Sequence, residues 1–274
     1  MKIGNKEFVT SGKTYIMGIL NVTPDSFSDG GKWNQMDAAL RHVEDMLAEG
    51  MDIVDIGGES TRPGYTLIPD QEEIDRVVPM IEAIKARFDV PISLDTYKSA
   101  VAKAGLSAGA DLINDIWGLK YDPNMARVIA EADAPSCLMH NRKAQDYRAF
   151  FPDMLDDLRE TLAIADASGI ARDTIILDPG VGFAKSLENN LECVRRLPEL
   201  ISAFNLPVLL GTSRKSFIGN TLDLPVDERM EPTGATCVLG ITKGCEIMRV
   251  HDVLPISRMC KITDAILAAG SRKG

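Results

Sequence analysis

Three polar residues, Asp95, Asn114 and Asp178, directly follow short apolar runs in this sequence. A carboxylate beside an amide can take part in two parallel hydrogen bonds, which suits the N–H and NH₂ edge of a flat heterocycle. Any one of these residues alone is more often a loop-capping residue than a ligand. Together they predict a binding site for such a heterocycle, if the fold brings the three runs side by side.

Cationic residues form a second group, which comprises Arg62, Lys215, Arg249 and His251. Arg249 and His251 are two residues apart, so on a strand both side chains point the same way. An arginine fork beside an imidazole is a natural partner for phosphate or carboxylate. The sequence therefore predicts an anion subsite next to the heterocycle site.

These residues lie at the ends of a repeated unit, in which a short apolar run precedes a segment with helical periodicity. Eight such units are typical of an α/β protein with a (β/α)₈ TIM barrel of about 250 residues. A doubly wound sheet is the alternative, but no GxGxxG fingerprint follows the first run. The eight apolar runs are Tyr15–Leu20, Ile53–Ile56, Ile92–Leu94, Leu112–Ile113, Ser136–Met139, Ile175–Leu177, Val208–Leu210 and Ile247–Val250.

Residues 1–14 predict a short N-terminal β-hairpin with Asn5 and Lys6 at its turn, capping the floor of a barrel over 15–270. With no linker or low-complexity segment, 1–274 is predicted to be a single domain. Helical periodicity is found, among other places, in residues 36–50, 72–88 and 186–204.

In such a barrel, functional residues lie at the carboxyl ends of the strands, on one face. Two long loops rich in Gly, Pro and Ser, 23–31 and 59–70, follow the first two strands and are typical of lids or substrate clamps. The residues predicted at the strand ends are Asn21, Gly57, Gly58, Glu59, Asp95, Asn114, Asp115, His140, Asp178, Ser213, Arg214, Lys215, Arg249 and His251.

Composition excludes several function classes. The 274-residue chain has 30 Lys and Arg against 40 Asp and Glu, a net charge of −10, which argues against general nucleic-acid or membrane-surface binding. No apolar run reaches 18 residues, so no membrane span is predicted. Five scattered cysteines without a CxxC pair predict buried, reduced thiols in a cytoplasmic protein, and three dispersed histidines do not form a zinc motif.

Six motifs occur in order: GILNVTPDSFSDGG, DIGGESTRPG, LINDIWG, LDPGVGF, GTSRKSFIG and RVHDV. Together they resemble the dihydropteroate synthase family over about residues 15–270. The resemblance implies a (β/α)₈ barrel and a transferase that joins p-aminobenzoate to 6-hydroxymethyl-7,8-dihydropterin pyrophosphate, forming 7,8-dihydropteroate and pyrophosphate. It further implies Mg²⁺ as cofactor and sulfonamides as inhibitors, and the assembly we expect is a homodimer.

The resemblance also implies how the site residues are used. Asp95, Asn114, Asp178 and Lys215 would hold the pterin, whereas Arg214 is expected to pair outward, away from the substrate. Pyrophosphate would leave ahead of attack by the arylamine, in an SN1-like step. In that step the two carboxylates would stabilise a cationic pterin.

Arg249 would stack on the pterin ring and, with His251, would hold the pyrophosphate, and Asn21 would reach the Mg²⁺. Arg249, His251 and Lys215, with two loop residues, Asp29 and Arg62, are the residues expected to act in catalysis. The residues expected to close the site or shape the p-aminobenzoate pocket are Phe27, Asp29, Thr61, Arg62, Pro63 and Ser216.

Two alternatives remain at this stage. A folate-dependent corrinoid methyltransferase shares the pterin-facing residues but has no pyrophosphate to hold, so it would not need both SRKS and RVH. A non-catalytic pterin-binding paralogue should have lost loop residues such as Asp29 and Arg62, which are present. Residues 140–152 depart from the common family pattern and are expected to form a variable loop, which leaves the role of His140 open.

Overall fold

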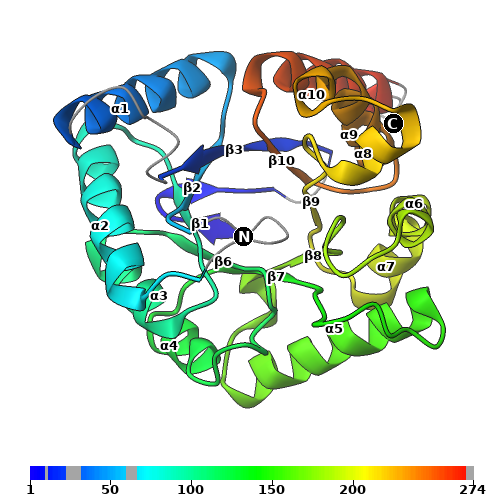
Figure 1. Ribbon diagram of the computed structural model, residues 1–274, viewed down its shortest axis with the longest axis horizontal. Helices are drawn as coiled ribbons and strands as arrows, with labels where there is room; N and C mark the ends of the chain where they lie inside the picture. Colours follow the sequence, from blue (N-terminus) through cyan, green and yellow to red (C-terminus); the bar gives the residue numbers. More distant parts are fainter. Residues whose placement is uncertain (10–11, 23–31, 60–66, 270–274) are drawn as a thin grey trace.

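The computed structural model describes residues 1–9, 12–22, 32–59 and 67–269. Figure 1 looks along a barrel of parallel strands with helices around its outside and the N-terminus near its centre. The strands are β3 (Tyr15–Asn21), β4 (Ile53–Gly57), β5 (Ile92–Asp95), β6 (Leu112–Asp115), β7 (Ser136–Met139), β8 (Ile175–Asp178), β9 (Leu209–Leu210) and β10 (Ile247–Val250).

The sheet order is β8-β7-β6-β5-β4-β3-β10-β9, with parallel pairing throughout. A parallel bridge between Leu177 and Val208 joins the two ends of this order, so the barrel is nearly closed. The predicted barrel is confirmed, and each of the eight apolar runs overlaps one strand. Five strands, β3, β4, β5, β6 and β8, extend one or two residues beyond their apolar run, so that Asn21, Gly57, Asp95, Asn114 and Asp178 lie within the ladder itself.

Helices follow the strands and cover the barrel from outside (Figure 1). The segment 186–204, predicted as one helical stretch, is two helices that meet at Arg196, because Pro198 has no N–H to continue the first. The helices are α1 (Lys32–Glu49), α2 (Asp70–Arg87), α3 (Ser99–Ala108), α4 (Met125–Glu131), α5 (Phe150–Ala167), α6 (Leu187–Arg195), α7 (Leu197–Phe204), α8 (Ser216–Leu222), α9 (Met230–Thr242) and α10 (Val253–Ala268).

The N-terminal hairpin consists of β1 (Lys2–Ile3) and β2 (Lys6–Glu7). The predicted turn at Asn5 and Lys6 is wrong by one residue, because Ile3 pairs with Lys6 and leaves Gly4 and Asn5 as the turn. Gly4 has a φ of +60°, a conformation that favours glycine.

The barrel interior and its outer layer have separate apolar cores. Side chains of the hairpin segment, including Ile3 and Phe8, pack against strand residues such as Met17, Ile53 and Leu112, and so close the barrel floor as expected. A larger cluster lies between the strands and the helices. All five cysteines are buried and unpaired, as predicted. None of the helices described combines the length and apolar character that crossing a membrane requires.

Candidate active site

Three polar residues and one glycine form a row across four neighbouring strands at their carboxyl ends. The ladder register places Asn21 opposite Gly57, Gly57 opposite Asp95, and Asp95 opposite Asn114. The Asp95 and Asn114 side chains are buried, and so is Asp178 on β8. The barrel therefore brings the three predicted heterocycle ligands to one end, as the sequence required.

Arg249 lies inside the barrel, where its guanidinium spans two carboxylates. Its Nε donates to Asp55 Oδ2 at 2.7 Å, and its Nη2 donates to Asp95 Oδ2 at 2.7 Å. Burial alone would lower the pKa of Arg249, but the charges of Asp55 and Asp95 outweigh it and raise that pKa. The cation is thus held across the barrel mouth, next to the acceptors of the first group.

Asp55 is a site residue that the strand-end analysis missed. It is fully buried and also accepts a hydrogen bond from Ser93 Oγ at 2.5 Å, and Asn114 Nδ2 approaches it at 3.4 Å. Its signal in the sequence is a lone carboxylate inside the apolar stretch IVDIG of β4. Since Lys, Glu, Arg and Asp are almost never fully buried unless paired, that position itself predicts a buried cation nearby.

One carboxylate oxygen of Asp95 accepts no hydrogen bond from the described residues. Oδ2 binds Arg249, whereas Oδ1 is buried and has no hydrogen-bond partner among the described residues. Burial raises the pKa of Asp95 to about 7; the Arg249 charge opposes this and the Asp55 carboxylate adds to it. A buried acceptor without a donor is costly, so Oδ1 is suited to a ligand N–H.

Lys215 faces Asp178 across Gly211, at the end of β9. A Cβ placed on Gly211 would lie 3.7 Å from Asp178 Oδ2, 3.8 Å from Lys215 Nζ and 3.9 Å from Arg249 Cβ. Lys215 Nζ donates to the carbonyl of Val181. Burial lowers the pKa of Lys215 to about 8, against the raising effect of Asp178. Asp178, Lys215 and Arg249 thus meet around Gly211, which has no side chain to fill the space between them.

Other strand-end residues have structural partners. Arg214 pairs with Asp252 through both Nε, at 2.9 Å, and Nη2, so the expected outward pairing is confirmed. Glu59 is buried and accepts from Lys98 Nζ at 2.7 Å. Asp115 accepts from the backbone N–H groups of the loop after β6, and it caps that loop.

His251 lies one residue beyond β10 rather than on it. Its Nδ1 is 2.9 Å from Ser213 Oγ, and its backbone N–H donates to the same hydroxyl at 3.1 Å. Arg249 and His251 thus have different partners in the described structure. Ser216 is exposed at the first turn of α8. The predicted loop residues Phe27, Asp29, Thr61, Arg62 and Pro63 lie outside the described residues.

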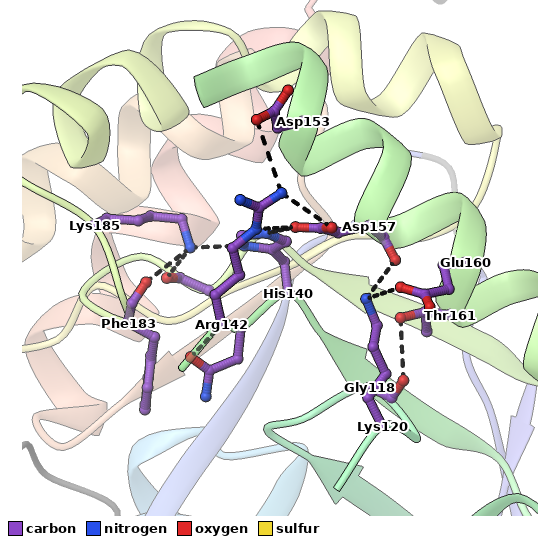
Figure 2. Close-up of polar contacts among 12 residues, drawn as sticks. Gly118, Lys120, His140, Arg142, Asp153, Asp157, Glu160, Thr161, Phe183 and Lys185 are labelled. Carbon is purple, nitrogen blue, oxygen red and sulfur yellow. Dashed lines mark hydrogen bonds and ion pairs between the residues drawn. The ribbon is translucent and has the colours of Figure 1, made fainter. Parts of the chain in front are cut away.

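His140, whose role the sequence leaves open, lies directly after β7. Figure 2 shows it at the centre of a polar network with Lys185, Asp157 and Arg142. Its Nε2 is 2.9 Å from Asp157 Oδ2 and its Nδ1 is 2.9 Å from Lys185 Nζ. Burial and the Lys185 charge lower the pKa of His140 to about 4. Residues 141–149 contain no helix or strand, as expected of a loop, and Arg142 ties this loop to Asp157 and Asp146.

Comparison with known proteins identifies the family of this chain. Residues 17–251 match the model of the pterin-binding enzyme family. A dihydropteroate synthase of Clostridium beijerinckii is 56% identical over 97% of this chain and 99% of that relative, and one of Bacillus subtilis is 56% identical over 94% and 90%.

Solved structures similar to this chain are also dihydropteroate synthases. A dihydropteroate synthase of Clostridium difficile, determined in the presence of pteroic acid, has a TM-score of 0.90 at 49% identity, covering 93% of this chain and 97% of that one. A Yersinia pestis enzyme in complex with a sulfonamide drug has a TM-score of 0.91 at 40% identity, covering 98% and 99%. The chain belongs to the dihydropteroate synthase family of pterin-binding enzymes.

Proposed function

We propose that the chain condenses p-aminobenzoate with 6-hydroxymethyl-7,8-dihydropterin pyrophosphate to give 7,8-dihydropteroate and pyrophosphate. The observation that carries the proposal is the unpartnered Asp95 Oδ1 at the mouth of a barrel whose register also brings Asn114 beside it. The names of the relatives support it, as does a Xanthomonas albilineans relative whose structure contains 4-aminobenzoic acid.

The pterin is held by acceptors on one side of the barrel and a cation on the other. Asp95 Oδ1 and Asp178 Oδ2 accept from the ring N–H and NH₂ groups, and Asn114 adds an amide. Lys215 Nζ donates to the pterin carbonyl oxygen and ring nitrogen. Asp95, Asn114 and Asp178 are buried and Lys215 is half-buried, so the low local dielectric strengthens these hydrogen bonds.

The leaving group departs with the electrons of the C–O bond that joins the pterin CH₂ to pyrophosphate. The electron-rich ring stabilises the resulting cation, with Asp95 and Asp178 nearby. The amine nitrogen of p-aminobenzoate then forms the C–N bond and loses a proton to solvent. Arg249 and His251 stabilise the growing charge on pyrophosphate, which requires the Arg249 fork to keep at least one N–H for the ligand.

Mg²⁺ is the expected cofactor, and the residues present fit it. Asn21 Oδ1 lies at the carboxyl end of β3, and a Cβ placed on the neighbouring Gly57 would lie 3.8 Å from it and from Asp95 Oδ2. Mg²⁺ commonly takes one or two protein oxygens together with substrate phosphates and water. Asn21 would hold the ion, which neutralises phosphate charge when bound.

The test is an assay of the purified chain with both substrates and Mg²⁺. Pyrophosphate should be released only when p-aminobenzoate is present, in equal amount to 7,8-dihydropteroate. Pterin binding without turnover would instead favour the non-catalytic paralogue. Methyl transfer from a methylated folate to a corrinoid protein would favour the methyltransferase. Homodimer formation is a separate proposal, which sedimentation of the same preparation would check.

The pH dependence of kcat/KM for the pterin substrate should show two limbs. Asp95 binds the pterin as a carboxylate, so activity should fall as the pH drops through about 7, its raised pKa. Lys215 binds as an ammonium, so activity should also fall as the pH rises through about 8, its lowered pKa. Steady-state rates from pH 5.5 to about 9.5 measure both limbs. Lys215→Met should remove the basic limb alone; if both limbs survive, the assignment is wrong.

A further inference from the structure

The loop after β8 has an unusual backbone. Within the five residues from Gly180 to Ala184, three have positive φ: Gly180 at +68°, Gly182 at +89° and Ala184 at +44°. Glycine adopts such angles freely, but Ala184 does not. A loop with this conformation persists only where its surroundings over-determine it.

Lys185 supplies much of that constraint. Its Nζ donates to Gly180 O at 2.8 Å and to Phe183 O at 3.1 Å, and it lies 2.9 Å from His140 Nδ1 (Figure 2). The three N–H groups of the ammonium thus have three acceptors, two of them carbonyls of the loop itself. The lysine side chain is buried, so no water replaces these bonds.

A series of hydrogen bonds connects Lys185 to α5 on the side away from the loop carbonyls. Because His140 Nδ1 accepts from Lys185, the imidazole proton lies on Nε2 and is donated to Asp157 Oδ2 at 2.9 Å. Arg142 forks onto the same carboxylate, with Nε at 2.6 Å from Oδ2 and Nη2 at 3.2 Å from Oδ1. Despite partial burial, these donors lower the pKa of Asp157, which keeps it charged. The buried ammonium is therefore linked to α5 through one neutral imidazole.

The same loop forms the wall beside Lys215. Val181 O accepts from Lys215 Nζ, and the Phe183 ring lies 4.6 Å from that nitrogen. A cavity of about 470 Å³ is lined by Gly182 and Phe183 together with Trp117 and Arg142. The Val181 side chain is buried in the apolar core, whereas Gly182 and Phe183 border this cavity. The bonds from Lys185 to the carbonyls of Gly180 and Phe183 hold the backbone on both sides of Val181 and so help to set where Val181 O and the Phe183 ring lie.

We propose that Lys185 is a positioning residue, which holds the loop from Gly180 to Phe183 through the His140–Asp157–Arg142 chain and thereby sets Lys215 in the pterin site. This inference rests on the proposed function. Lys185 itself has its three donors occupied and does not contact the substrate. Its effect on the reaction passes through the loop to Lys215.

The test is a double-mutant cycle between Lys185→Met and Lys215→Met, read as pterin pyrophosphate affinity by calorimetry and as kcat/KM. Lys185→Met alone should lower kcat/KM by about 10- to 100-fold, the scale of a small misplacement of a catalytic group. In the Lys215→Met background the same change should cost less than about threefold, because coupled residues are non-additive. Equal losses in both backgrounds would mean a general structural role and would overturn the inference.

Two further variants keep the test decisive. Asp157→Asn weakens the hydrogen bonds that His140 and Arg142 make to α5, at a position outside the loop. It should lower kcat/KM several-fold, and this can be measured even if Lys185→Met fails to fold. If Asp157→Asn leaves kcat/KM unchanged, the proposed role of the His140–Asp157–Arg142 hydrogen bonds is wrong.

The matched control is Lys120→Met. Lys120 donates to Asp157 O and Glu160 in the same region (Figure 2), and its charge favours the carboxylate form of Asp157, but in the described structure it donates to no carbonyl of Gly180–Ala184. Its loss should therefore lower kcat/KM by less than either Lys185→Met or Asp157→Asn. Wild-type turnover is measured first: an inactive wild type contradicts the proposed function, whereas an active wild type matched by Lys185→Met contradicts only this inference.

Discussion

Arg249→Lys should lower kcat by about 10²–10³-fold, the usual loss when one donor to a developing oxyanion is removed. The guanidinium bonds Asp55 and Asp95 through two different nitrogens and has further N–H groups for the leaving pyrophosphate. A lysine provides one point charge and no flat face, so it cannot bind Asp55, Asp95 and the pyrophosphate in the geometry of the guanidinium. Because the lost bonds strengthen in the transition state, kcat should fall more than KM rises. Steady-state kinetics, with each substrate varied while the other is saturating, measures kcat and both KM values.

The expected contacts of Arg249 are with the pterin ring and the pyrophosphate, and its ion pairs with Asp55 and Asp95 add a contribution to stability. Removing one partner from a buried ion pair typically costs about 3–5 kcal/mol, because a charge is left uncompensated. Arg249→Ala should therefore lower the free energy of unfolding by about that amount, whereas Arg249→Lys keeps the charge and should lose less. Urea denaturation of the two variants separates this effect from the kinetic one.

Asp55→Asn in the Arg249→Ala background is the matched control. It removes one of the two buried negative charges, so it should recover part of the stability without recovering turnover. His251→Ala should cost less than Arg249→Ala, since His251 lies beyond the strand and bonds Ser213. A near-native kcat for Arg249→Lys would show that only a point charge is needed, and the bidentate role would be wrong.

The barrel could be predicted from the sequence because its strands are buried on both faces. Such strands appear as continuous apolar runs, and each run overlaps an observed strand. The runs end too early at Asp95 and Asp178 because ladder hydrogen bonds depend on the backbone, not on side-chain polarity. The ligand acceptors are thus fixed by the register of the sheet, which explains why their positions were predictable.

Partners across the barrel could not be predicted in this way. Asp55 lies in the middle of a strand, and its partner Arg249 is 194 residues away. A search of strand ends finds the cation but not the carboxylate that orients it. Nothing local in the sequence states which of the buried charges will meet, because that depends on the stagger of strands around the barrel.

The same limit applies to the network of Lys185. Its members come from the loop after β8, the end of β7 and α5, so only the closed fold brings them together. Lys185 lies two residues beyond the motif LDPGVGF, so the motif does not single it out. A lysine just after a glycine-rich segment is usually exposed; here the positive φ angles of the loop turn its carbonyls toward the ammonium.

Asp178→Asn should weaken binding of the pterin pyrophosphate by roughly 30- to 10⁴-fold. This range corresponds to two buried ligand donors left unpaired, at about 1–3 kcal/mol each. Asparagine retains one oxygen, which can still accept from Gly180 N as Asp178 Oδ1 does at 2.7 Å. Its NH₂ group would replace Oδ2 and would face the donors of the pterin. Titration calorimetry with the pterin substrate measures the loss directly.

The thermal melt of Asp178→Asn should change little, because burial already disfavours the charged form and raises the pKa of Asp178. Asp115→Asn is the matched control, since Asp115 is also buried and ends β6, which is separated from β8 by β7 alone. Both of its oxygens accept from backbone N–H groups, of Trp117 at 2.8 Å and Leu119 at 2.7 Å, so it has none left for a ligand. Asp115→Asn should therefore lower the melting temperature while leaving pterin affinity within a few-fold. The opposite pattern, with native affinity in Asp178→Asn, would remove Asp178 from the pterin site.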